Sequence, residues 1–81
     1  MSDRPSRASD ASEEQALRLE QIAREAVTLA DHARLAATHF RNGEVPRAGA
    51  HSLAVEGHLV RIRRVLDEIA VVHVARSRAV P

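Results

Sequence analysis

The 81-residue chain contains no cysteine, tryptophan, tyrosine or lysine, and it has a single phenylalanine. The absence of cysteine excludes disulfide bonds and zinc sites built on thiolates. The near absence of aromatic rings removes the usual platforms for stacking nucleic-acid bases. Because alanine and valine make up most of the apolar residues, so short a chain buries little surface by itself. We therefore expect one small domain that associates with other chains.

Long apolar runs and an excess of charge of one sign are also missing. No apolar stretch approaches the roughly 20 residues that a membrane span needs, and the first ten residues hold no apolar segment of a secretory signal. Twelve arginines face eleven acidic residues, for a net charge of +1, which gives no strong basic field. We expect a cytoplasmic protein without membrane association. The sequence has no glycine-rich phosphate loop and no nucleophile triad, so it predicts neither an enzyme nor catalytic residues.

Two long helices are predicted. The capping-box pattern from Ser12 to Gln15 indicates that the first helix begins at about residue 13 and continues to about residue 41. Asn42 and Gly43 tolerate the left-handed conformation that ends helices. Pro46 suits the first turn of a second helix, which we expect to continue to about residue 76.

These boundaries divide the chain into three parts. Residues 1–12 are polar and are expected to form a disordered tail. Residues 13–76 form a helical hairpin with its turn at 42–46. Residues 77–81 are expected to fray.

Apolar residues recur at alternating spacings of three and four in both helices, which is typical of coiled-coil packing. The first series is Leu19, Ile22, Ala26, Leu29, Ala33, Ala36 and Phe40, and the second is Ala48, Ser52, Val55, Leu59, Ile62, Leu66, Ile69 and His73. The short connection makes the helices antiparallel neighbours. The predicted fold class is all-α: a long antiparallel two-helix hairpin that assembles into a helical bundle as a homo-oligomer.

A second stripe on the second helix would be left in water by the hairpin alone. Its members are Leu53, Gly57, Val60, Arg64, Asp67, Val71 and Val74. Against an antiparallel copy, Arg64 would meet Asp67 of the partner subunit and each contact would occur twice, as a two-fold interface requires. The stripe therefore predicts the interface of a homodimer or tetramer.

Histidine is unusually frequent, with five in the chain. His32, His39, His51 and His58 flank the predicted seam, and antiparallel pairing places His39 opposite His51 and His32 opposite His58. Such imidazoles could bind zinc or another divalent transition metal. The two pairs are expected about 10 Å apart along the helices, so each would need further ligands. The alternative interpretation is a polar flank that gains charge in mildly acid solution.

The fifth histidine, His73, falls on the predicted seam opposite Gln15 at the open end of the hairpin. A histidine in such a place is more often a hydrogen-bonded residue of the end layer than a ligand or a base.

Arginines make the second helix the more basic one. Arg61, Arg63, Arg64 and His58 could contact the phosphates of a nucleic acid or a nucleotide ligand. Acidic residues four positions later on the same helix neutralise much of that charge. The main hypothesis is a small non-enzymatic interaction module that homo-oligomerises and presents a surface rich in histidine and arginine to a protein partner. Binding of a nucleic acid or nucleotide is the first alternative, and binding of a metal is the second.

The turn and its surroundings resemble helical hairpins of two families. Residues 43–48 are similar to the turn of a tetratricopeptide repeat, which occurs here in one copy where stacking needs about three. Residues 37–59 resemble hairpins of HEPN domains, some of which are ribonucleases that use an arginine and a histidine a few residues apart. Arg34 and His39 have that spacing. The resemblance covers less than half of the chain and leaves a ribonuclease as the last alternative.

Overall fold

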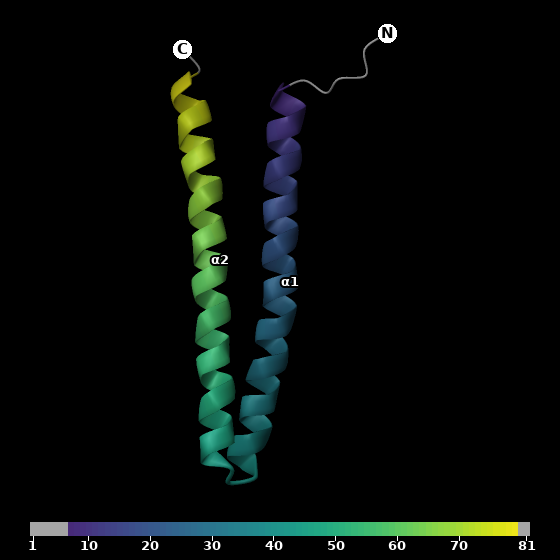
Figure 1. Ribbon diagram of the computed structural model, residues 1–81, viewed down its shortest axis with the longest axis vertical. Helices are drawn as coiled ribbons and strands as arrows, with labels where there is room; N and C mark the ends of the chain where they lie inside the picture. Colours follow the sequence, from purple (N-terminus) through teal and green to yellow (C-terminus); the bar gives the residue numbers. More distant parts are fainter. Residues whose placement is uncertain (1–6, 80–81) are drawn as a thin grey trace.

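The computed structural model describes residues 7–79 as two helices that lie side by side in an antiparallel hairpin (Figure 1). Helix α1 spans Arg7–Arg41 and helix α2 spans Val45–Ala79, each with 35 residues. The first turns of α1 and the last turns of α2 lie at one end of the hairpin, and the connecting turn closes the other end (Figure 1). The predicted all-α hairpin is confirmed. Within residues 7–79, neither helix is long and apolar enough to cross a membrane.

The helices extend further than the sequence predicts. Helix α1 begins at Arg7, so the expected cap at Ser12 lies inside the helix. Alanines at positions 8 and 11 favour the helix, and Asp10 in its first turn suits the helix dipole. Helix α2 likewise continues through the segment that was expected to fray, as far as Ala79. The remainder of the predicted tail, residues 1–6, and the last two residues lie outside the described part of the chain.

The turn ends α1 as predicted. Gly43 adopts a positive φ of 74° and its N–H donates to the Phe40 carbonyl at 3.1 Å. The N–H of Glu44 donates to the His39 carbonyl at 2.8 Å. These two bonds form a Schellman motif, which satisfies carbonyls at the end of the helix. The Glu44 carbonyl then accepts the first bond of α2 from Ala48 at 3.0 Å, so α2 starts immediately after the turn.

Gly43→Ala is expected to destabilise the hairpin by about 1 kcal/mol, because a side chain at this φ is strained even where space is free. Gly49→Ala is the matched control. Gly49 lies in α2 with nothing within 4 Å of the position that a Cβ would take, so alanine there should stabilise the helix by up to about 1 kcal/mol. Urea unfolding at one protein concentration measures both. Equal effects of the two substitutions would contradict the role given to Gly43.

The seam between the helices is rotated by one residue from the predicted one. In α1 the least exposed side chains follow the series Gln15, Arg18, Ile22, Glu25, Leu29, His32, Ala36 and His39. In α2 they follow Ala48, His51, Val55, His58, Ile62, Val65, Ile69 and Val72. Three of the seven predicted positions in α1 are therefore confirmed, namely Ile22, Leu29 and Ala36, and four of the eight in α2, namely Ala48, Val55, Ile62 and Ile69.

The remaining four positions of each predicted series are wrong. The residues in question are exposed: Leu19, Ala26, Ala33 and Phe40 in α1, and Ser52, Leu59, Leu66 and His73 in α2. Their places in the seam are taken by the residues that directly precede them. Both the predicted residues and those that precede them satisfy the spacing of three and four. The observed seam lets charged groups pair between the helices, as Glu25 does with His58. The predicted apolar residues lie outside the seam.

These exposed residues share one face of the hairpin. Two antiparallel helices are related by a pseudo-twofold axis perpendicular to the plane that contains both of them. Residues at the same heptad position of the two helices therefore lie on the same face of the hairpin. We define the apolar face as Leu19, Ala26, Ala33, Phe40, Leu59 and Leu66. Alanines at 16, 23, 30 and 37 extend it over α1. The opposite face of the seam holds the ion pairs that Arg61 and Glu68 make with α1.

The hairpin is a single layer with very little core. Among the described residues, the buried hydrophobic side chains are Ala36, Ala48 and Val65. The radius of gyration is 18.6 Å, where a compact domain of this length would have about 12 Å. The smallest extent, 12 Å, is the thickness of one helix. The described hairpin is therefore one layer of two helices, whereas domains commonly pack two or more layers around a core.

Candidate functional site

Four histidines pack against one another along the seam and form what we term the imidazole ladder: His39, His51, His32 and His58, in that order. The ring centroids of successive members are 5.4, 5.1 and 5.5 Å apart. The predicted pairs His39 with His51 and His32 with His58 are confirmed. The two pairs are not isolated from each other, because the rings of His51 and His32 are also in contact, with centroids 5.1 Å apart. Since the seam passes through the histidines themselves, His51 lies between His39 and His32 and contacts both.

Carboxylates close both ends of the ladder. At the turn, His39 Nδ1 lies 3.1 Å from Glu44 Oε1, and Arg47 donates to the other oxygen of that carboxylate at 3.2 Å. At the far end, His58 Nδ1 contacts Glu25 Oε2, and Arg61 Nε donates to Glu25 Oε1 at 3.1 Å. The side chains of His39 and His58 are only 19% and 12% exposed. The ladder is therefore a shielded row of imidazoles whose ends are fixed by ion pairs.

Glu25 is held in its ionised form by these neighbours. The hydrogen bond with His58 lowers the pKa of Glu25 from its usual 4.5, and a hydrogen bond and the positive charge of Arg61 lower this pKa further. Desolvation opposes them by raising the pKa. Because the folded pKa is the lower one, the ionised carboxylate stabilises the fold above about pH 4.5, and this contribution is lost as the pH falls through the folded value.

Glu25→Gln is expected to lower the urea midpoint at pH 6, and the difference from the wild type should shrink as the pH falls below 4.5. The neutral amide cannot take up the proton that the carboxylate takes up in acid, so the variant lacks this part of the pH dependence. Glu56→Gln is the control, since Glu56 is an exposed carboxylate on α2. A midpoint difference for Glu25→Gln that stays constant from pH 6 to pH 3 would contradict the assignment.

The centre of the ladder is the contact between His32 and His51, whose Nδ1 atoms lie 2.9 Å apart across the seam. In neutral imidazoles one of these nitrogens donates its hydrogen and the other accepts it. Within residues 7–79, no three histidine, aspartate or glutamate side chains are grouped so as to hold one metal ion. The four histidines that the sequence proposes as metal ligands are thus brought together as successive pairs. Binding of a metal stays a prediction.

The predicted nucleic-acid contacts are not gathered into one patch. Arg61 and His58 are both engaged by Glu25. Arg63 borders a shallow hollow beside Leu59 on the apolar face, whereas Arg64 borders another hollow that holds two acidic residues. Contact with phosphates stays a prediction, and no observation in the described chain strengthens it.

The predicted interface stripe on α2 is free of contacts with α1 for most of its length. Leu53, Val60, Val71 and Val74 are exposed, as are Arg64 and Asp67, and Gly57 is half-buried. The stripe is accessible to a second chain, and its role as an interface stays a prediction.

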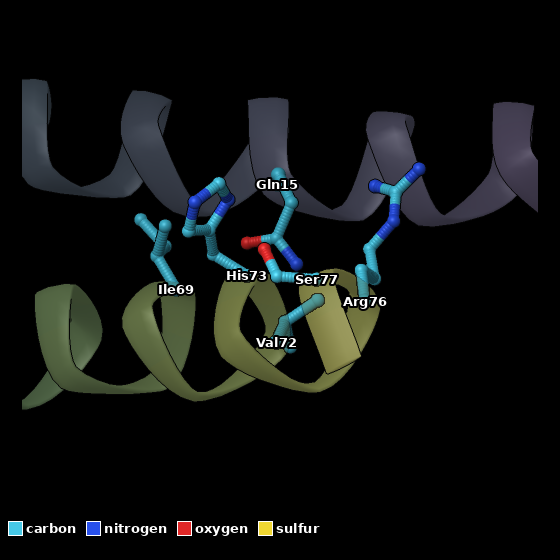
Figure 2. Close-up of a pocket in the computed structure, with 6 residues that line it drawn as sticks. All are labelled: Gln15, Ile69, Val72, His73, Arg76 and Ser77. Atoms are coloured by element: carbon cyan, nitrogen blue, oxygen red, sulfur yellow. The ribbon is translucent and has the colours of Figure 1, made fainter. Parts of the chain in front are cut away.

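A hollow of about 360 Å³ lies at the open end of the hairpin (Figure 2). The side chains of Gln15 from α1 and of His73 and Ser77 from α2 lie between the two helices there (Figure 2). The sequence places His73 opposite Gln15, and both line this hollow. Gln15 Oε1 is enclosed without a hydrogen-bond partner among the described residues. The hollow is lined mainly by apolar surface but contains the polar groups of Gln15, His73 and Ser77, and it is large enough for water molecules that would satisfy Gln15.

Sequence reasoning found the four histidines and named Arg61 as a phosphate contact, but it missed Glu25, with which Arg61 pairs. The signal for Glu25 was present, because it belongs to a heptad-spaced polar series with Arg18, His32 and His39.

The pair suggested by the HEPN resemblance is not assembled. Arg34 is exposed and pairs with Asp31, whereas His39 lies in the seam with Glu44. Comparison of the chain with models of protein families, with curated proteins and with solved structures finds no match.

Proposed function

We propose that this protein is a small helical interaction module that associates with a second copy of itself through the apolar face to form a four-helix bundle. The observation that carries the proposal is the exposure of large hydrophobic side chains on one face. Leu19, Phe40, Leu59 and Leu66 are between 43% and 54% exposed. Large apolar side chains that are exposed on one face are typical of protein interfaces.

The amount of exposed surface agrees with a missing partner. The chain exposes 6327 Å². A compact monomer of 8.9 kDa would expose about 4,800 Å². The excess is about 1,500 Å² per chain, and a standard stable interface buries roughly 800 Å² on each partner, so the excess is large enough for such an interface. A second layer of two helices would cover a surface of this size.

The shape of the apolar face favours a second copy as the occupant. On α2 it carries the large side chains Leu59 and Leu66, whereas on α1 it is lined mainly by alanines. A two-fold axis parallel to the helices would place α2 of each subunit over α1 of the other. Large residues would then meet small ones, which fills space and allows close approach of the helices. All four helices would have antiparallel neighbours, as in up-and-down bundles.

Sedimentation velocity over a hundredfold range of concentration tests the proposal. We expect a dimer at micromolar concentrations that dissociates on dilution. A monomer at every concentration would refute self-association.

A further inference from the structure

The contact at the centre of the imidazole ladder brings two potential metal ligands within hydrogen-bond distance of each other. His32 on α1 and His51 on α2 approach each other through Nδ1, at 2.9 Å. Both side chains are half-buried. Helix α1 and helix α2 each contribute one ring. An ion bound by both nitrogens would therefore link the two helices in the half of the hairpin that is closer to the turn.

The distance between the nitrogens is compatible with one shared ion. Metal–imidazole bonds are about 2.0 Å long, so two nitrogens on one ion lie about 2.9 Å apart at a right angle and about 3.3 Å apart at the tetrahedral angle. The observed 2.9 Å is the length of the hydrogen bond between the rings, so it does not select one metal over another.

We propose that His32 and His51 form a two-imidazole site for a divalent transition metal, with Cu²⁺ bound most tightly. Binding replaces the hydrogen bond between the rings. The Nδ1 proton of the donating ring is released to solvent and that ring takes up a proton on Nε2, so both rings are neutral and both Nδ1 lone pairs are available to the ion. The order of affinity follows the general series in which Cu²⁺ exceeds Ni²⁺ and Zn²⁺.

The outer histidines support the site and do not complete it. His39 Nδ1 is engaged by Glu44 and His58 Nδ1 by Glu25, so the nitrogens of these rings that face carboxylates are not free for the same ion. This agrees with the absence of any group of three ligands in the part of the chain that the structure describes. The remaining coordination positions belong to water. The rings of His39 and His58 stack on His51 and His32 and so limit their rotation.

The test is titration of the purified full chain with CuSO₄ and, separately, with NiSO₄ and ZnSO₄, followed by calorimetry and by electron paramagnetic resonance of the Cu²⁺ form. We expect one Cu²⁺ per chain, hyperfine structure from two nitrogens, and tighter binding of Cu²⁺ than of the other two ions. At a hundredfold excess over the dissociation constant, Cu²⁺ should raise the melting temperature by about 10 °C.

Matched alanine variants locate the site. His32→Ala and His51→Ala should each weaken Cu²⁺ binding at least tenfold, since each removes one of two ligands. His73→Ala is the control, because His73 lies on α2 outside the ladder, and it should change the affinity less than twofold. Circular dichroism confirms that each variant keeps its helices, which alanine favours.

Three outcomes would overturn the proposal. The first is an equal loss of Cu²⁺ affinity in His73→Ala and in the ladder variants. The second is no loss of Cu²⁺ affinity when His32 and His51 are both replaced by alanine. The third is a stoichiometry of one ion per two chains. The last would mean that the ion is shared between subunits. None of these outcomes depends on whether the apolar face forms a dimer, which sedimentation of the metal-free protein decides separately.

Discussion

Replacing Leu59 by glutamate is expected to convert the proposed dimer into monomers. Leu59 lies near the middle of the apolar face and is 52% exposed in the hairpin. Complete burial of a leucine side chain contributes about 1.5–3 kcal/mol, so burial of the exposed half of Leu59 contributes about half of that. The two-fold axis applies the substitution twice, and a loss of about 1.5–3 kcal/mol per dimer weakens association about ten- to a hundredfold. The added cost of burying a carboxylate weakens it further.

The neighbouring residue supplies the control. Val60 is 53% exposed, so it matches Leu59 in accessibility and differs in the direction in which it points. It belongs to the stripe on α2 that the sequence predicts as an interface. Val60→Glu should leave the dimer intact in sedimentation velocity if the apolar face is the interface. Dissociation by Val60→Glu and not by Leu59→Glu would move the interface to the predicted stripe.

The main features of the fold follow from local signals in the sequence. Asn42 and Gly43 end one helix, Pro46 lies in the first turn of the next, and the intervening segment is too short for anything but an antiparallel return. These signals depend on a few neighbouring residues. The structure therefore agrees with them closely.

The seam could be predicted only in part, because its signal is degenerate. Ile22, Leu29 and Ala36 can be completed into a coiled-coil series by the residues at 26 and 33 or by those at 25 and 32. Hydrophobicity favours the first set, and the structure has the second. The choice depends on pairing between helices, such as Glu25 with His58 and Arg61, which a pattern along one helix does not contain.

The ambiguity of the seam also explains why the candidate site was predicted only in part. The pairing of His39 with His51 and of His32 with His58 depends only on the register of the two helices, so it could be predicted. Their union into one ladder depends on the rotation of the helices. That rotation places His51 between His39 and His32, which the predicted seam kept apart.

The second large effect is expected from replacing both central histidines by leucine. His32→Leu combined with His51→Leu should stabilise the hairpin by about 2 kcal/mol and raise its melting temperature by about 10 °C. Two half-buried seam positions would gain apolar contacts, and the hydrogen bond between the imidazoles would be removed from both sides at once. Removing both partners of a hydrogen bond in favour of apolar groups is often neutral or stabilising.

The single substitutions distinguish this explanation from a general preference for leucine. Either one alone leaves the other Nδ1 in the seam without its partner, which offsets the gain from the leucine. Each single variant should therefore lie close to the wild type, and the double variant should exceed the sum of the two. His73→Leu, an exposed position, should change stability by less than about 0.5 kcal/mol. Thermal unfolding at one fixed chain concentration measures the whole cycle, because dissociation of a dimer would otherwise shift every midpoint. A double variant less stable than the wild type would mean that the imidazole pair contributes more to the seam than two leucines do, and that the ladder is retained for stability.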